Sequence, residues 1–323
     1  MKQKIIIWLS VLLLLVVVVF MVKDFFYQPK SSNDNPYEYK TNKLRYVDPS
    51  LIGYKEVAQI KPDIEQLHGI AIDKSDNIYL AGNDKVIVYD NGLIQKSFFK
   101  TGKEARCVAV DEDVIYLGVQ DHIEIYDLSG NHLKSWNPIN EKSVITSIAL
   151  TEKFVYVADA GNRIVYQFDR EGNLLKEIGK KNVDKGILGF IIPSPYFDLL
   201  IGRDGELWVV NPGRHSLESY NERGDLISSW GKASMDVDGF SGCCNPSNIA
   251  MLSDGSFVTS EKTIERVKVY LQTGEFKSVV ASPENFEKGT KGIDLAVDSK
   301  DRIYILDPVK KIVTIFERDK HVN

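Results

Sequence analysis

Two adjacent cysteines, Cys243 and Cys244, are the residues whose type and spacing most directly suggest chemistry. They lie in residues 239–246, which read GFSGCCNP. Neighbouring residues of an extended chain point to opposite sides, so both thiols cannot fill one core pocket. The pair therefore predicts either an unusual loop or thiol chemistry.

Four interpretations of the pair are open. The cysteines shape a tight loop, or they form a vicinal disulfide in an oxidising compartment. Their Cα spacing of about 3.8 Å is below the usual range of about 4.4–6.8 Å, so that ring would be strained. Alternatively they bind a soft metal or a redox partner as thiolates, or one of them pairs with the third cysteine, Cys107. We expect Cys107 to be a small buried residue instead.

Residues 259–266 (TSEKTIER) are expected to neighbour the cysteine loop. Lys262 would favour a thiolate, and Glu261 adds a carboxylate. With Asn245, these residues form the first candidate site, which would bind a ligand, a partner or a metal.

The elements that position this loop repeat along the chain from residue 54. Pairs of apolar strands recur, each with an aromatic residue in the first strand and another in the second. The first series is Tyr79, Tyr116, Tyr156, Trp208, Phe257 and Tyr304, and the second is Tyr89, Tyr126, Phe168, Tyr220, Tyr270 and Phe316. The second series is spaced by 37, 42, 52, 50 and 46 residues, which are periods typical of propeller blades. We interpret these aromatic residues as core.

Each repeat adds a small-apolar strand before the pair and a more polar strand after a glycine turn, giving four strands. Gly92, Gly130, Gly172, Gly224 and Gly274 are expected at positive φ in these turns. The sixth repeat lacks its last strand, while residues 54–60 form an orphan strand before the first repeat. We predict an all-β, six-bladed propeller over residues 54–320, closed by the N-terminal strand in its last blade.

Residues 154–169 (FVYVADAGNRIVYQFD) resemble an NHL repeat, and the resemblance extends more loosely over residues 54–320. It implies a six-bladed NHL-like propeller. Such propellers serve as binding platforms and some relatives are enzymes, so the fold does not determine the function.

One face of such a propeller carries the loops that enter the first strands and the loops between second and third strands. These loops contain a basic set of candidate binding residues, namely His68, Arg106, Arg163, Arg214 and His215. The set predicts a small anionic ligand or an acidic protein partner. The alternative for Arg163 is that it pairs with Asp159 to brace its own loop.

The enzyme alternative is a metal-dependent lyase or lactonase that uses the central channel, as in some similar six-bladed propellers. Such an enzyme needs several His or carboxylate ligands around one metal. His68, His122 and His215 are the histidine candidates, and none belongs to a catalytic motif. The sequence therefore favours a binding module over an enzyme and assigns no cofactor beyond a metal in the channel or at the cysteine loop.

The N-terminus predicts a membrane anchor. Residues 5–22 form an apolar run interrupted by Ser10 alone, within an anchor region at residues 1–27. Residues 28–53 are expected to be a tether. No small-x-small site follows the run, which favours an uncleaved anchor over the alternative of a cleaved secreted form. Lys2 and Lys4 place the N-terminus in the cytoplasm and the propeller outside it.

The formal charge of −5 combines two unlike parts. Residues 1–24 hold three lysines and one aspartate, a net +2, so the rest of the chain carries −7. This acidic remainder argues against nucleic-acid binding, which needs clustered Lys and Arg.

Overall fold

The computed structural model describes residues 8, 12–21, 23, 41–184 and 187–320. The chain divides into two compact units, residues 1–41 and 42–323. Residues 12–21 are helical. Among the described residues, no helix combines the length and hydropathy of a membrane span. The predicted anchor at residues 5–22 and the predicted tether at residues 28–53 lie partly outside the described residues.

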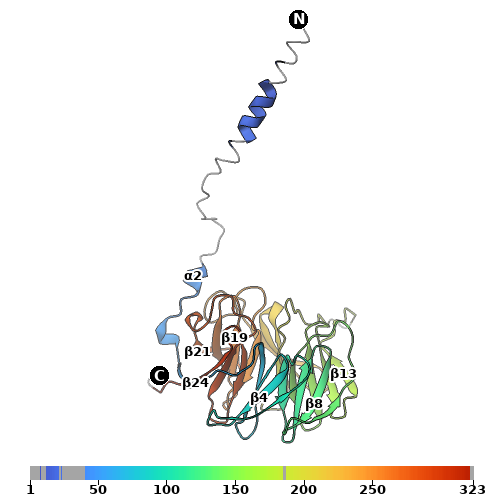
Figure 1. The fold of residues 1–323 in the computed structure, drawn as a ribbon. Coiled ribbons are helices and arrows are strands. Elements are labelled where there is room, and N and C mark those ends of the chain that lie inside the picture. The colour runs from blue at the N-terminus through green and yellow to red at the C-terminus, as the bar shows by residue number, and fades with distance from the viewer. Residues whose placement is uncertain (1–7, 9–11, 22, 24–40, 185–186, 321–323) are drawn as a thin grey trace. The chain divides into compact units, whose positions relative to one another are not determined.

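The second unit is a six-bladed β-propeller, as predicted, with four antiparallel strands in each sheet (Figure 1). Blades one and two contain β2 (Leu67–Ile72), β3 (Ile78–Gly82), β4 (Lys85–Tyr89), β5 (Gln95–Lys100), β6 (Cys107–Val110), β7 (Val114–Val119), β8 (His122–Asp127) and β9 (His132–Ser135). Blades three and four contain β10 (Ile145–Leu150), β11 (Phe154–Asp159), β12 (Ile164–Asp169), β13 (Leu174–Ile178), β14 (Leu199–Ile201), β15 (Leu207–Asn211), β16 (Ser216–Tyr220) and β17 (Leu226–Gly231). Blade five contains β18 (Asn248–Met251), β19 (Phe257–Glu261), β20 (Arg266–Tyr270) and β21 (Phe276–Ala281).

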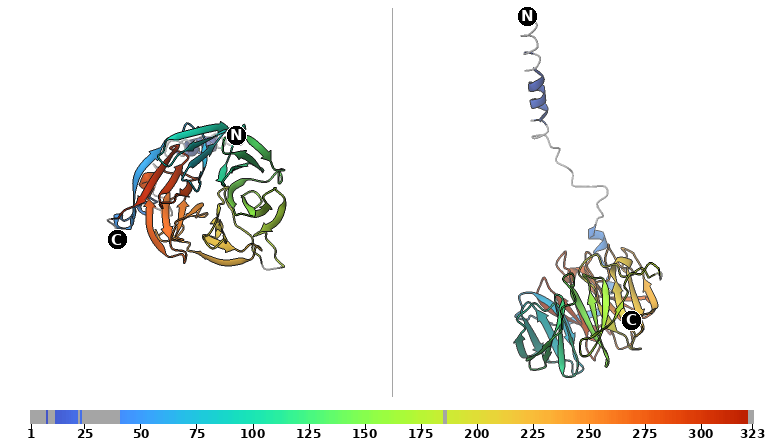
Figure 2. Two further views of the ribbon diagram at one scale, coloured as in Figure 1. Left: turned by 90° about the horizontal axis from the view of Figure 1, so that it is seen from below. Right: turned by 90° about the vertical axis from the view of Figure 1, so that its right-hand side faces the viewer.

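Blade six is closed by the N-terminal strand, as the orphan strand predicted. It holds β22 (Asp294–Val297), β23 (Ile303–Asp307) and β24 (Ile312–Arg318), with β1 (Tyr54–Ile60) on the outside of β24. Figure 2 shows the six sheets around a central axis, with the N-terminal strand beside the C-terminal one. The closure gives blade six its fourth strand, so that each of the six sheets has four strands.

The residues just before β1 also contact the propeller. Two short helices, α2 (Thr41–Leu44) and η1 (Pro49–Leu51), precede β1. Arg45 pairs with the buried Glu265, and its guanidinium donates to the carbonyl of Pro283, which begins η3 (Pro283–Asn285), at 3.0 Å. Part of the predicted tether thus lies against blades five and six.

Burial explains the strand patterns. In blades one to five the second and third strands are largely buried on both sides, as in β7 and β8, and in blade six β24 becomes exposed at its C-terminal end. Outer strands such as β9 are exposed along their length. All twelve aromatic residues of the two series are buried, which confirms their interpretation as core. The inner strands β2, β6, β10, β14, β18 and β22 each contact the next and enclose the central channel.

The glycine turns follow the prediction in four blades. Gly130, Gly172, Gly224 and Gly274 have positive φ between third and fourth strands. The prediction for Gly92 is wrong, because Leu93 takes the left-handed conformation there, with φ 65°. The Asp90 carboxylate accepts from the backbone of Gly92 and Ile94 and fixes this turn instead.

Candidate functional site

The face predicted to carry the site opens into a cavity of about 510 Å³ at the mouth of the channel. The lining comes from loops that enter the inner strands and from the second loop of blade six. Its polar side chains are His68, Glu104, Arg106, Thr146, Tyr196, Asn248, Lys291 and Asp294. All six blades therefore contribute to one concave surface.

The rim of this cavity carries basic side chains. Arg106 and Lys291 line it together with His68. The acid among them is Glu104, 3.2 Å from His68 Nε2 and 3.8 Å from Arg106 Nε. Burial lowers the pKa of His68, an effect that Arg106 strengthens and Glu104 opposes.

Beneath the rim lies a floor of acceptors, in which Asn248 and Asp294 line the cavity and Asp198 lines the channel next to it. Asp198, Asn248 and Asp294 stand at the start of neighbouring inner strands. The amide of Asn248 donates to Asp294 Oδ1 at 3.1 Å, and backbone N–H groups of Ile249 and Ile70 donate to Asp198 and Asp294. Burial raises the pKa of Asp198 to about 6 and, together with the charge of Asp198, that of Asp294 to about 7. In the sequence, the aligned first strands DLLIG, NIAML and DLAVD each begin with Asp or Asn. This shared position could have identified the three residues.

The opposite mouth of the channel differs in charge. A second cavity of about 450 Å³ there is lined by Asp73, Asp76, Asp298 and Asp301, with Lys74 and Arg203 as the cations. The channel therefore has one mouth rich in basic side chains and one rich in carboxylates. An anion is attracted to the first of them.

The two adjacent cysteines lie with their sulfurs 3.3 Å apart, and both are free thiols. Cys243 is exposed and Cys244 is buried. Burial acts to raise the pKa of Cys244, but hydrogen bonds from Cys243, Lys262 and Ser194 outweigh it and lower the pKa. The pKa of Cys243 is raised, chiefly by its hydrogen bond to Cys244 and by the charge of that sulfur.

Lys262 connects the cysteines to the cavity wall. Its ammonium donates to the Ser194 hydroxyl and lies 4.5 Å from the centre of the Tyr196 ring, a cation–π contact. Tyr196 lines the cavity. Neither cysteine lines it, so the thiol pair lies behind this wall.

The structure places Glu261 and Asn245 inside the protein. The Glu261 carboxylate is fully buried, 2.8 Å from Arg266 and 3.0 Å from Lys268, and accepts from the backbone N–H of Ser241. Burial lowers the pKa of Lys268 to about 8. Asn245 donates to the carbonyls of Ser241 and Lys262 and accepts from the N–H of Lys262. Both residues hold the cysteine loop in place.

Glu261 occupies a position that recurs in other blades. Asp159, Asn211 and Asp307 also end second strands, are buried and accept from backbone N–H groups of nearby loops. The register of YVAD, WVVN, VTSE and YILD could have identified this bracing role from the sequence.

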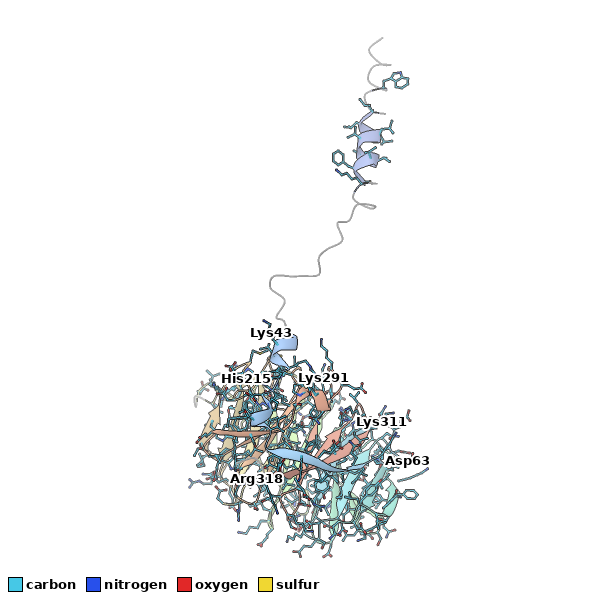
Figure 3. All side chains as sticks on the ribbon, turned by 90° about the vertical axis from the view of Figure 1, so that its left-hand side faces the viewer. Lys43, Asp63, His215, Lys291, Lys311 and Arg318 are labelled. Atoms are coloured by element: carbon cyan, nitrogen blue, oxygen red, sulfur yellow. The ribbon has the colours of Figure 1, made fainter. Side chains whose placement is uncertain are left out.

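The remaining predicted residues lie outside the cavity lining. Arg163 is exposed, and its predicted pairing with Asp159 is replaced by hydrogen bonds from Gly161 and Asn162 to that carboxylate. Arg214 pairs with Glu218 at 3.3 Å, next to the 3-10 helix η2 (Pro212–Arg214). Figure 3 shows His215 and Lys291 on the same upper side of the propeller.

His122 takes part in a different cluster. Its ring nitrogens lie 2.7 Å from Asp121 and 2.8 Å from Glu124, and His132 contacts the same glutamate at 2.6 Å. Within residues 41–184 and 187–320, no three His, Cys, Asp or Glu side chains are arranged to hold a metal ion.

Comparisons with known proteins bear on the fold. No protein-family model and no curated protein sequence matches the chain. Among solved structures, a streptogramin B lyase superposes with a TM-score of 0.58 at 11% identity, covering 84% of this chain and 100% of the lyase. An inactive variant of virginiamycin B lyase from Staphylococcus aureus, bound to quinupristin, gives 0.55 at 10% identity over 82% and 100%. A protein of unknown function from Bacteroides thetaiotaomicron gives 0.60 at 14% identity over 82% and 72%. At these identities the likeness shows the propeller fold.

Proposed function

We propose that this chain is a membrane-anchored, NHL-like propeller that acts outside the cytoplasm as a binding module for a small anionic ligand or an acidic partner. The cysteine loop beside the cavity would make it responsive to redox state or to a metal. The observation that carries the proposal is the cavity with His68, Arg106 and Lys291 on its rim.

The size and the chemistry of the cavity support this proposal. A volume of about 510 Å³ falls within the range of small-molecule sites, about 300–1,000 Å³. Arg106 offers a planar guanidinium that suits carboxylate or phosphate, and Lys291 adds a second cation. Tyr196 provides an aromatic wall backed by the Lys262 ammonium.

The test is a thermal-shift panel of small carboxylates and phosphates on the propeller unit, residues 42–323. A ligand present at 100 times its Kd should stabilise the folded state by about 2.7 kcal/mol. Arg106→Ala and Lys291→Ala should abolish the shift. The matched control is Arg203→Ala, which removes an exposed cation at the opposite mouth and should retain the shift. The proposal fails if no anion stabilises the wild type or if the shift survives both substitutions.

Lyase or lactonase chemistry in the channel is the second candidate. It is favoured by the acceptor floor, where the Oδ1 atom of Asn248 is buried without a hydrogen-bond partner beside Asp294. Asp198, Asn248 and Asp294 are oxygen donors of the kind that Mg²⁺ or Ca²⁺ binds, and these residues would hold such an ion. When bound, it would supply Lewis-acid polarisation of a substrate oxygen. Metal analysis of the purified unit tests this candidate, with Asp294→Asn as the variant that should lose a stoichiometric metal.

A further inference from the structure

Cys243 and Cys244 are adjacent free thiols, one exposed and one buried. We propose that these residues form a thiol–disulfide exchange site for low-molecular-weight disulfides, in which exposed Cys243 reacts first and buried Cys244 closes the intramolecular disulfide. This inference rests on the part of the proposed function that assigns redox or metal responsiveness to this loop, and it selects the redox form.

The arrangement of the two sulfurs supports a division of roles. Exposed Cys243 is accessible to a dissolved disulfide, whereas Cys244 is buried behind it. Their sulfurs are 3.3 Å apart, so closure to a bond of about 2.05 Å needs a small movement. A buried thiol this close can attack a mixed disulfide on Cys243 more readily than it can meet an external molecule.

The surroundings of Cys244 favour its thiolate. The Lys262 ammonium and the Ser194 hydroxyl, which bond to each other, lower the pKa of Cys244 against the effect of burial. The thiolate is the form that attacks a disulfide. Lys262 itself is buried. The Tyr196 ring lies against its ammonium, and the Asn245 side chain donates to its backbone carbonyl.

The same lysine argues against a metal ion at this pair. A cation bound by both sulfurs would lie close to the Lys262 ammonium, and like charges repel in a buried place. A closed metal site also needs about four donors. Lys262 therefore favours thiol–disulfide exchange over metal binding at this pair.

The reaction balances in two steps. The Cys243 thiol gives its proton to the adjacent Cys244 thiolate, and the Cys243 sulfur attacks one sulfur of a disulfide R–S–S–R, so that a mixed disulfide Cys243 Sγ–S–R forms and one R–S⁻ leaves. The Cys244 thiol then loses that proton to water. The Cys244 thiolate then attacks the Cys243 sulfur, the Cys243–Cys244 bond forms and the second R–S⁻ leaves. Two protein thiols are oxidised, and one small disulfide is reduced to two thiols.

The test uses the full chain with Cys107→Ser as background, so that Cys243 and Cys244 are the two thiols that remain to be counted. The protein is equilibrated in glutathione buffers of increasing oxidised fraction, quenched with acid and alkylated, and the free thiols are counted by mass. Both thiols should disappear together at one midpoint. Addition of Cys244→Ser should instead accumulate a glutathione adduct on Cys243.

Two further variants separate the roles of the residues. Cys243→Ser should leave Cys244 at least about tenfold slower toward oxidised glutathione, because the buried sulfur is not accessible. Lys262→Met should slow closure several-fold and shift its pH profile upward, and Lys262→Arg should restore much of the rate. Unchanged circular dichroism and Tm for each variant confirm that the loop change has not unfolded the propeller.

The inference is overturned if both thiols survive at every glutathione ratio, or if an adduct on Cys243 persists in the presence of Cys244. Anion binding is measured on the same protein samples. If the exchange reaction is absent but anion binding is present, the redox assignment of the loop is wrong and the binding function stands. If exchange occurs but no anion binds, the proposed binding function is wrong and the redox assignment stands.

Discussion

At the scale of single residues, the propeller depends on a buried group of charges in blade five. Glu261 joins Arg266 and Lys268 inside the protein and also holds the N–H of Ser241 in the cysteine loop. Removing one partner of a buried pair leaves the others uncompensated.

We predict that Glu261→Gln destabilises the propeller by about 3–5 kcal/mol, because two buried cations lose their carboxylate. Chemical denaturation of the unit at residues 42–323 measures the change. The matched control is Glu112→Gln, which breaks an exposed pair with Lys74 and should cost less than about 1 kcal/mol. Equal stability of the two variants would show that the buried group does not support the fold.

The channel carboxylates predict a pH dependence. Their folded pKa values, about 6 for Asp198 and about 7 for Asp294, lie above the ordinary value of 3.8. Between these limits the folded state binds more protons than the unfolded state, so stability falls as pH rises from about 4 to 7. Each carboxyl contributes a slope of up to about 1.4 kcal/mol per pH unit.

Asp294→Asn should flatten this decline in stability, measured by denaturation at a series of pH values. Asp301→Asn, at the opposite mouth, is the control and should leave the slope as in the wild type. A slope unchanged by Asp294→Asn would contradict the raised pKa.

Residue roles were the least predictable part of the site. Asp198, Asn248 and Asp294 look like ordinary strand starts, and their meaning arises when six inner strands enclose one channel. Glu261 looked like a ligand-binding residue because VTSEK was considered alone rather than in register with YVAD and YILD. Arg106 and His68 were predictable, because their loops enter inner strands at the same face.

At the scale of elements, the closing strand β1 holds the ring together. Its register runs from Tyr54 opposite Arg318 to Ile60 opposite Val313, with an irregularity between Glu56 and Ala58. Without β1, the backbone of β24 would present an open edge.

We predict that deleting residues 1–60 lowers the Tm strongly and causes aggregation, since blade six then lacks its outer strand. Deleting residues 1–41 is the control, because it keeps β1 and the Arg45–Glu265 pair. Thermal unfolding and size-exclusion chromatography compare the two proteins. Identical behaviour would mean that the ring does not need its N-terminal strand.

Elements were predicted well because repetition supplies several copies of each signal. The missing outer strand of the last repeat and the polar alternation of residues 54–60 together predicted the pairing of β1 with β24. The turn at Leu93 was missed because Gly92 is the second residue after Asp90, whereas Gly130 and Gly172 are the third residues after Asp127 and Asp169. The position that needs positive φ therefore falls on Leu93.

At the scale of the whole molecule, we propose a membrane anchor joined to an extracytoplasmic propeller. The anchor is a proposal from the apolar run at residues 5–22. Leu13→Arg with Val17→Arg should move the full chain from the membrane fraction to the soluble fraction, because each charge costs about 2.5–3.5 kcal/mol in the apolar layer. Val183→Arg, on an exposed propeller loop, is the control and should stay with the membrane. Retention of the double variant in the membrane fraction would contradict the anchor.

We propose that the mouth of the channel lined by Arg106 and Lys291 binds an anion. This proposal is tested most directly by a crystal structure of residues 42–323 with the anion that gives the largest thermal shift. We expect the anion in the cavity of about 510 Å³, within about 3 Å of donor atoms of Arg106 and Lys291. An anion found at Arg203 on the opposite mouth, with this cavity holding none, would contradict it.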